Sequence, residues 1–498
     1  MVNGEWLVVG GWWLVFGGIT GIFDGRGRLS CGFVLGGWGV KVMAGGFWPD
    51  YRAVWRWHFY AGLMCLPFVV ILSMTGGVYL FRPQIEAWEE QAYEGLRLTG
   101  VSASEAGEGS STGGAIGAAL GAFEGAGFVS CELPRREDSA VRVMVRRGGE
   151  LMRVYVHPET LEVLGWVPDE QRLMRIFFRL HGELLMGDRG SNLVETVACW
   201  TIVLLLTGVF LWWPRGQRSL AGVLYPRFGG GRRLFWRDMH AVTGMWLTGF
   251  ALFLLLTGLP WAKFWGDYFR EVRQLTGLSG LKQDWANSSA AKKGGGGEVG
   301  SAGHSGHGSG GIGILKGDLP SVEVLDTMAM NIRLLGLEPP VLLAAPGGRT
   351  RTWSGKSETQ NRPLRVTVEL DAGTGAILSR EDFSGKHWID RAVGYGIAAH
   401  EGQLFGWVNV VLGLLSALGL VLISLSAVLM WWRRRSVGTL GAPAAIARER
   451  ASGFLLLSIV VLGVCFPLFA ASLAVVLMLE WSFLRRFEPV RHWLGLAS

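Results

Sequence analysis

Four of the nine histidines stand in two matching pairs along the chain. His58 is followed by a glycine after 4 residues and by a Thr-Gly pair after 17 and 18, and His240 is followed by the same residues at the same distances. His181 precedes a glycine by 6 residues and a Trp-Trp pair by 31, and so does His400. This self-similarity indicates a duplicated unit. Histidines preserved beside long apolar runs are well suited to bind a metal or haem iron.

Composition and the length of the apolar runs predict a mostly α-helical, polytopic membrane protein. Half of the 498 residues are hydrophobic, only 17% are charged, and the mean hydropathy is +0.31, which is unusual for a soluble chain. A helix needs about 20 apolar residues to cross a membrane, and five stretches reach that length: 59–81, 193–213, 241–264, 408–432 and 454–479. The histidine repeat assigns four of them to a duplicated four-helix core, with the fifth helix outside it.

Arginines at the ends of the spans set the predicted orientation. They precede the first span, fill the connection between the second and the third, and close the fourth. Because Lys and Arg collect on the cytoplasmic side, the two long loops are expected in the periplasm, outside a bacterial inner membrane. The net charge of +7 and the pI near 9.3 follow from this orientation and from attraction to membrane lipid, and they require no nucleic-acid partner.

The predicted boundaries follow the spans and loops in chain order. The membrane spans are 51–82, 192–214, 240–264, 405–432 and 453–481, with cytoplasmic loops at 215–239 and 433–452. Two small α+β periplasmic domains occupy 83–191 and 265–404, and the second contains a flexible Gly/Ser insertion at 288–313. The ends are an N-terminal extension at 1–50 and a C-terminal tail at 482–498. Met43 is a more natural start than Met1, so we interpret residues 1–42 as a start-site overextension or an incidental sixth apolar segment.

The two long loops repeat a pattern of strands around a polar turn. In the first, a helix at 114–125 precedes strands at 141–146, 153–156 and 162–167. In the second, strands at 364–370 and 376–378 enclose a turn at 371–375. The pattern aligns His157 with Asp371, and a turn of this kind needs only a short polar side chain. We therefore predict a structural role for His157.

Several strings resemble the PepSY-associated transmembrane proteins, and the turns in the long loops resemble those of PepSY domains. The strings are Trp55-Arg56-Trp57-His58, Leu180-His181, Leu211-Trp212-Trp213-Pro214-Arg215, His240 with Thr257-Gly258, and His400-Glu401-Gly402 with Trp431-Trp432-Arg433-Arg434. The resemblance covers about residues 51–435. It implies a bacterial inner-membrane protein of the kind often associated with iron uptake, a family that includes haem-containing reductases of ferric siderophores. The first turn departs from the usual Asp-Pro-x-Thr-Gly at His157 and Leu161.

The predicted topology pairs the histidines across the two halves of the chain. His58 and His240 begin spans that run outward, so both lie at the cytoplasmic end, while His181 and His400 precede spans that run inward and lie at the periplasmic end. A pseudo-twofold axis along the membrane normal then relates the members of each pair. A haem on that axis would receive one histidine from each half, so we expect two six-coordinate b-type haems. Such haems have no open position for substrate and carry electrons.

Structural roles compete with ligation for these histidines, because polar residues at interfacial helix ends often cap backbone groups or anchor in the headgroup region. His181 lies 12 residues before the second apolar run, within an amphipathic stretch. His387, beside Trp388, is the substitute candidate, although it has no counterpart in the first half. His492 follows the fifth span and is interpreted as a surface residue.

The residues that follow the histidines also permit two interpretations. Gly62 and Gly244 share a helix face with His58 and His240, where a missing side chain would suit either a macrocycle or close helix packing. The threonines of the two Thr-Gly pairs are expected to bond the backbone of their own helix.

The leading hypothesis is an inner-membrane dihaem protein that passes electrons to a periplasmic acceptor such as a ferric siderophore. The cytoplasmic connections are too short for a flavin or dinucleotide domain, so the donor would be membrane quinol or a separate reductase. The alternative is a non-catalytic membrane protein whose periplasmic domains bind or regulate a partner. A permease is disfavoured, because the spans carry almost no acidic residue of the kind that ion coupling uses.

Overall fold

The computed structural model describes most of the chain from residue 50 onward and short parts of what precedes it. The described residues are 21–23, 29–31, 33–35, 38–40, 50–98, 111–215, 219–277, 315, 319–347, 352–443, 453–484 and 486–495. The predicted insertion at 288–313 lies outside them, as does most of the N-terminal extension. The described parts of that extension are two strand pairs, β1 (Gly21–Phe23) with β2 (Leu29–Cys31) and β3 (Phe33–Leu35) with β4 (Trp38–Val40).

Five candidate membrane spans occur within the described residues, as the apolar runs predict. They are α1 (Tyr51–Tyr79), α5 (Asp188–Trp212), α6 (Gly231–Gly258) with the turn to Trp261, α10 (Trp407–Arg434), and Pro467–Leu484. Large apolar side chains on these helices point away from the protein, for example Leu415 and Leu418 of α10, which are 57% and 58% exposed. Exposed apolar surface of this kind suits contact with lipid, and the chain is a polytopic membrane protein.

The third and fifth spans differ most from their predicted bounds. The third helix, α6, begins at Gly231, nine residues before the predicted start at 240, because the arginine-rich turn ahead of the apolar run is helical as well. The fifth apolar segment, predicted as one span at 453–481, is two helices, α11 (Gly453–Cys465) and α12 (Pro467–Leu479). Phe466 between them has non-helical φ −132° and ψ 83°, and Pro467 has no backbone N–H to continue the ladder.

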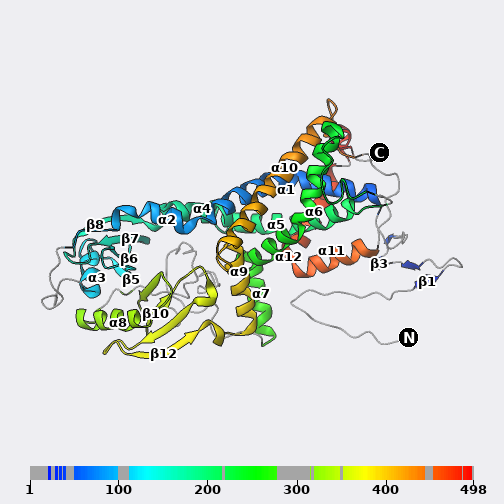
Figure 1. Cartoon of the computed structure of the whole chain (residues 1–498). Helices are drawn as coiled ribbons and strands as arrows, with labels where there is room; N and C mark the ends of the chain where they lie inside the picture. Colours follow the sequence, from blue (N-terminus) through cyan, green and yellow to red (C-terminus); the bar gives the residue numbers. More distant parts are fainter. Residues whose placement is uncertain are drawn as a thin grey trace, which may run out of the picture. The chain divides into compact units, whose positions relative to one another are not determined.

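The two long loops build one antiparallel sheet of eight strands (Figure 1). The first loop supplies β5 (Gly127–Leu133), β6 (Val141–Arg147), β7 (Glu150–Val156) and β8 (Val163–Pro168). The second supplies β9 (Val341–Ala344), β10 (Trp353–Ser357), β11 (Val366–Leu370) and β12 (Ile377–Asp382). The strand order is β12-β11-β10-β9-β5-β6-β7-β8. The central pair joins the loops, with Cys131 opposite Leu343.

One face of the sheet packs against α3 (Thr112–Gly121) and α8 (Val322–Leu334). The alternation of β6 directs Val141, Val143 and Val145 into this core. The largest buried core side chains include Ile116, Phe128, Leu325, Met328 and Trp353. At the turns, His157 Nδ1 accepts from the backbone N–H of Thr160 (3.1 Å) and Asp371 Oδ1 from that of Thr374 (2.8 Å). The predicted turn role of His157 is thus confirmed.

The opposite face of the sheet carries buried charges that tie it to α2 (Arg82–Glu89). The carboxylate of Glu90, at the end of α2, contacts Arg142 (2.8 Å), Arg153 (3.2 Å) and Arg172 (3.2 Å), and it accepts a hydrogen bond from Tyr155 (3.0 Å). Burial alone would raise the pKa of Glu90, but the three arginines and the tyrosine lower it to about 2. Glu90 is therefore a fixed negative charge that holds α2 on the sheet.

By contacts the chain divides into two compact units. The first comprises Met1–Met64, Leu206–Trp213 and Trp431–Ser498, and the second comprises Cys65–Leu205 and Pro214–Met430. The second unit contains the sheet and the helices α4 (Leu173–Glu183), α7 (Lys263–Leu275) and α9 (Trp388–His400). The first contains the start of α1, the end of α5 and α13 (Glu488–Leu494).

Candidate functional site

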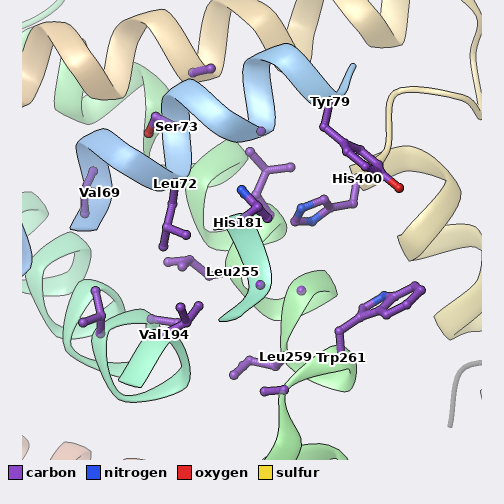
Figure 2. Close-up of a pocket in the computed structure, with 18 of the residues that line it drawn as sticks. Val69, Leu72, Ser73, Tyr79, His181, Val194, Leu255, Leu259, Trp261 and His400 are labelled. Carbon is purple, nitrogen blue, oxygen red and sulfur yellow. The ribbon is translucent and has the colours of Figure 1, made fainter. Parts of the chain in front are cut away.

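His181 and His400 lie next to each other in the second unit, as the topology predicts. His181 is in the last turn of α4, and His400 is the last residue of α9. Their ring centroids are 6.4 Å apart and their planes make an angle of 76°. Figure 2 shows the two imidazoles side by side among the apolar residues of the cavity. The helix ends therefore bring together two residues that are 219 positions apart in sequence, since 400 − 181 = 219.

A threonine hydroxyl fixes the orientation of each ring. Thr75 Oγ1 lies 3.0 Å from His181 Nδ1, and Thr257 Oγ1 lies 3.0 Å from His400 Nδ1. Each hydroxyl also donates to a carbonyl of its own helix, Thr75 to Ile71 (2.8 Å) and Thr257 to Phe253 (2.7 Å). The expected backbone bonds are thus confirmed, but they are only part of the threonines' role.

The direction of these hydrogen bonds determines the tautomer of each histidine. A hydroxyl has a single proton, and both threonines use it on the backbone, so each hydroxyl accepts from the Nδ1–H of its histidine. Nε2 of His181 and of His400 then keeps its lone pair, which is the form in which imidazole binds a metal. Burial lowers the pKa of both histidines to about 4, and for His181 the neighbouring His400 adds to the effect. Both rings are therefore neutral at pH 7.

The two rings border a cavity of about 280 Å³ whose lining belongs entirely to the second unit. Most of the lining is apolar or glycine, including Leu72, Gly77, Leu254, Leu255, Gly413 and Ala417, and Figure 2 shows Leu72 and Leu255 near the two rings. The glycine after each threonine makes room for a ring: a Cβ at Gly76 would lie 3.0 Å from His181 Cε1, and one at Gly258 3.4 Å from His400 Cε1. The repeated Thr-Gly pairs therefore bind one edge of each imidazole and leave space for it.

The other two predicted ligands are held in a similar way, each within its own unit. In the first unit, His58 Nδ1 lies 2.9 Å from Thr207 Oγ1, and a Cβ at Gly208 would lie 3.4 Å from His58 Cε1. In the second unit, His240 Nδ1 donates to the carbonyl of Ile423 (3.1 Å) and lies 3.3 Å from Ser426 Oγ. Pairing of His58 with His240 across the units stays a prediction.

The spacing of the repeats contains a sequence signal for these hydroxyl partners. Thr207 and Ser426 each stand five residues before a Trp-Trp pair, and Thr75 and Thr257 each stand 17 residues after a histidine. Every candidate histidine therefore has a hydroxyl partner on a membrane helix at a repeated position.

A family model described as the PepSY-associated TM region matches residues 55–434. The chain belongs to this family. The matched region contains all four candidate histidines and runs from α1 to the last residue of α10, so α11, α12 and α13 lie outside it. Comparison with curated proteins gives no match.

The remaining histidines of this PepSY-associated protein that were considered as ligands have other roles. His387 is the N-cap of α9, where its Nδ1 accepts from the backbone N–H of Ile389 (3.3 Å). It is not among the residues that line the cavity. His492 is exposed on α13, beyond the family match. The structure therefore places His181, and not the substitute His387, beside His400.

Glu195 is an acidic residue of the PepSY-associated region that is buried within a membrane helix. Glu195 of α5 is 1% exposed and lines the cavity. Its Oε2 accepts from the backbone N–H of Trp265 (2.9 Å) in the first turn of α7, so Glu195 caps that helix. Its Oε1 is buried and has no hydrogen-bond partner among the described residues.

Proposed function

We propose that this protein carries electrons through two b-type haems, one held by His181 and His400 and the other by His58 and His240. In this proposal it resides in a bacterial inner membrane with its sheet in the periplasm. The acceptor is a periplasmic ferric chelate of the siderophore class.

The separation of His181 and His400 is the observation that carries the proposal. A metal–imidazole bond is about 2.0 Å long and the ring centroid lies about 1.15 Å behind the bonding nitrogen, so two axial imidazoles on one iron have centroids about 6.3 Å apart. In the structure the two ring centroids are 6.4 Å apart. Because a porphyrin would supply the other four ligands, two histidines are enough to complete the coordination of a six-coordinate iron.

Three further features of the cavity favour a haem over a chance contact between two rings. Both imidazoles are neutral, with Nδ1 occupied and the Nε2 lone pair available. The lining is apolar and rich in glycine, which suits a flat macrocycle. Each hydroxyl partner hydrogen-bonds the histidine at Nδ1, which orients the ring and raises its basicity.

A haem held by His181 and His400 would supply an iron that takes up and releases one electron. The chain's own residues perform the remaining tasks. His181 and His400 would hold the iron, Thr75 and Thr257 keep both rings in the ligating tautomer, and the apolar lining would exclude water. The donor is a membrane quinol, which gives up two electrons and two protons, or a separate reductase. Two ferric ions are reduced for each quinol oxidised.

Electron transfer to ferric chelates is the experiment that tests this function. The detergent-purified full chain would be reduced anaerobically with a quinol analogue and mixed with ferric citrate or a ferric trihydroxamate, with a chromogenic ferrous chelator present. We expect the reduced haem spectrum to return to the oxidised form as ferrous iron appears, and His58→Ala and His400→Ala to abolish this. A folded, haem-free protein would refute the proposal and favour the alternative of a partner-binding membrane protein.

A further inference from the structure

The helices that carry His181 and His400 are each anchored by buried charges at the end away from the histidine. His181 is in the last turn of α4, which begins at Leu173, and His400 is the last residue of α9, which begins at Trp388. At a rise of about 1.5 Å per residue, the anchored end is about 12 Å from the histidine along α4 and about 18 Å along α9. The threonine contacts fix the histidine ends, so the charges at the other ends determine how each helix lies.

Glutamates at the end of α2 hold the start of α4. The guanidinium of Arg172, the N-cap residue of α4, lies 3.3 Å from Glu86 and 3.2 Å from Glu90. Glu89 accepts a hydrogen bond from the backbone N–H of Leu173 at 3.0 Å. Arg172 and Glu90 are both buried, and α2 packs against α4. The first turn of α4 is therefore tied to α2 through its backbone and through an ion pair.

The second half of the chain has the same arrangement with the charges exchanged. Arg273, in the last turn of α7, donates from Nη1 and Nη2 to the two carboxylate oxygens of Asp390, at 2.8 and 3.1 Å. Asp390 is in the first turn of α9, and both residues are buried. The arginine thus stands on the histidine helix in the first half and on its neighbour in the second, but in both halves the pair holds the start of the histidine helix.

Each histidine helix is supported at both ends by one continuous piece of chain. α2 follows α1, whose Thr75 binds His181, and α7 follows α6, whose Thr257 binds His400. A buried ion pair stabilises a fold little more than apolar side chains of the same volume would, but its hydrogen bonds are directional. The recurrence of such a pair at the same place in both halves therefore favours a role in positioning over a role in stability alone.

We propose that Arg172 and Arg273 are positioning residues that set the separation of His181 and His400. They act through α4 and α9 and do not touch the iron. The consequence for haem rests on the proposed function, whereas the placement of the two rings does not. Loss of either anchor would let one helix shift and move its imidazole away from the axial position.

Carbon monoxide tests this inference in haem-loaded protein, because it binds a ferrous haem only where an axial position is open. Detergent-purified full chain would be reduced with dithionite and titrated with carbon monoxide by absorbance. Wild type should bind none. Arg172→Met removes the charge but keeps an unbranched side chain, and it should bind about one carbon monoxide per chain as His181 leaves the iron.

Arg365→Met is the matched control. Arg365 is a buried arginine of the same unit whose carboxylate partner, Glu358, lies 3.2 Å away and seven positions earlier in the chain. Its loss removes a comparable ion pair that does not hold α4, so this variant should bind no carbon monoxide. Glu89→Ala removes only the hydrogen bond to Leu173, and it replaces Arg172→Met if that variant does not fold. In haem-loaded protein the inference is overturned if Arg172→Met and Glu89→Ala both stay as unreactive as wild type, or if Arg365→Met reacts equally.

A haem-free arm separates this inference from the proposed function. If the chain takes up no haem, melting temperatures would be compared for wild type, Thr75→Val, Arg172→Met and the double variant. Positioning predicts that Arg172→Met already weakens the hydrogen bond of Thr75 to His181, so the double variant should lose less than the sum of the two single losses. Thr75→Val with Arg365→Met should give additive losses. Additive losses in both pairs would overturn the inference, whereas coupling confined to Arg172 would support it and refute only the haem.

Discussion

Replacing Thr75 by valine tests the role assigned to the hydroxyls beside the histidines. Valine has nearly the shape of threonine, so Thr75→Val removes the 3.0 Å hydrogen bond to His181 Nδ1 with little change in packing. The backbone carbonyl that Thr75 also binds keeps its place in the helix ladder. The expected loss is therefore confined to the orientation and basicity of one imidazole.

The size of the effect follows from the position of the Thr75 hydroxyl, which is one hydrogen bond away from the proposed ligand His181. Loss of such a partner costs about 10- to 100-fold in metal affinity, or about 1.4–2.7 kcal/mol at about 1.4 kcal/mol per factor of ten. Thr257→Val should have an effect of similar size, because its hydroxyl lies at the same 3.0 Å from His400 Nδ1.

Haem transfer to excess apomyoglobin, followed by absorbance, measures the predicted change as a faster dissociation rate. Thr75→Ser keeps a hydroxyl and should behave as wild type. Thr248→Val is the control, since Thr248 makes the same kind of bond to its own helix (2.7 Å to the carbonyl of Gly244) but has no histidine partner among the described residues. Equal dissociation rates for Thr75→Val and wild type, or for Thr75→Ser and Thr75→Val, would refute the reasoning.

Three further predictions follow from the geometry. Gly76→Val places a Cβ 3.0 Å from His181 Cε1, so it should displace the ring and lower the haem content by one per chain while the far-ultraviolet circular dichroism stays unchanged; full haem content would contradict this. Because the pKa of Glu90 is lowered from its usual 4.5 to about 2, ionised Glu90 should contribute about 3 kcal/mol of stability above pH 4.5 that is lost as the pH falls toward 2; melting temperatures against pH should show this acid limb in wild type and not in Glu90→Gln. Arg273→Ala removes the buried ion pair with Asp390 and should destabilise the protein by about 3–5 kcal/mol, whereas the double variant Arg273→Ala/Asp390→Ala should recover part of the loss; a single variant as stable as wild type in denaturant titration would count against the pair.

The membrane spans and the proximity of His181 to His400 could be predicted from the sequence, because both depend on features that are local or repeated. Apolar length fixes which segments can cross a membrane, and the equal offsets after each histidine assign residues to matching helix ends. The polar turn at His157 was predictable for the same reason, since the alignment with Asp371 compares two short segments.

The sequence did not predict features that depend on pairing between distant segments. The contact of β5 with β9 joins residues about 200 positions apart, and neither strand carries a pattern that specifies its partner. The same limit applies to Thr75 and Thr257. Their hydroxyls were expected to bond their own helix and do so, but the histidine that each also binds comes from a remote segment. The break at Phe466 was missed because a long apolar run outweighed the proline that follows.

The haem content of the purified chain tests the central claim most directly. A pyridine haemochrome assay, with oxidised and dithionite-reduced spectra, would be made on wild type and on His400→Ala and His58→Ala. Paired axial histidines predict sharp low-spin bands, two b-type haems per chain in wild type and one in each variant. A wild-type protein that folds in the membrane without haem, or a His400→Ala variant that keeps both haems, would contradict the account.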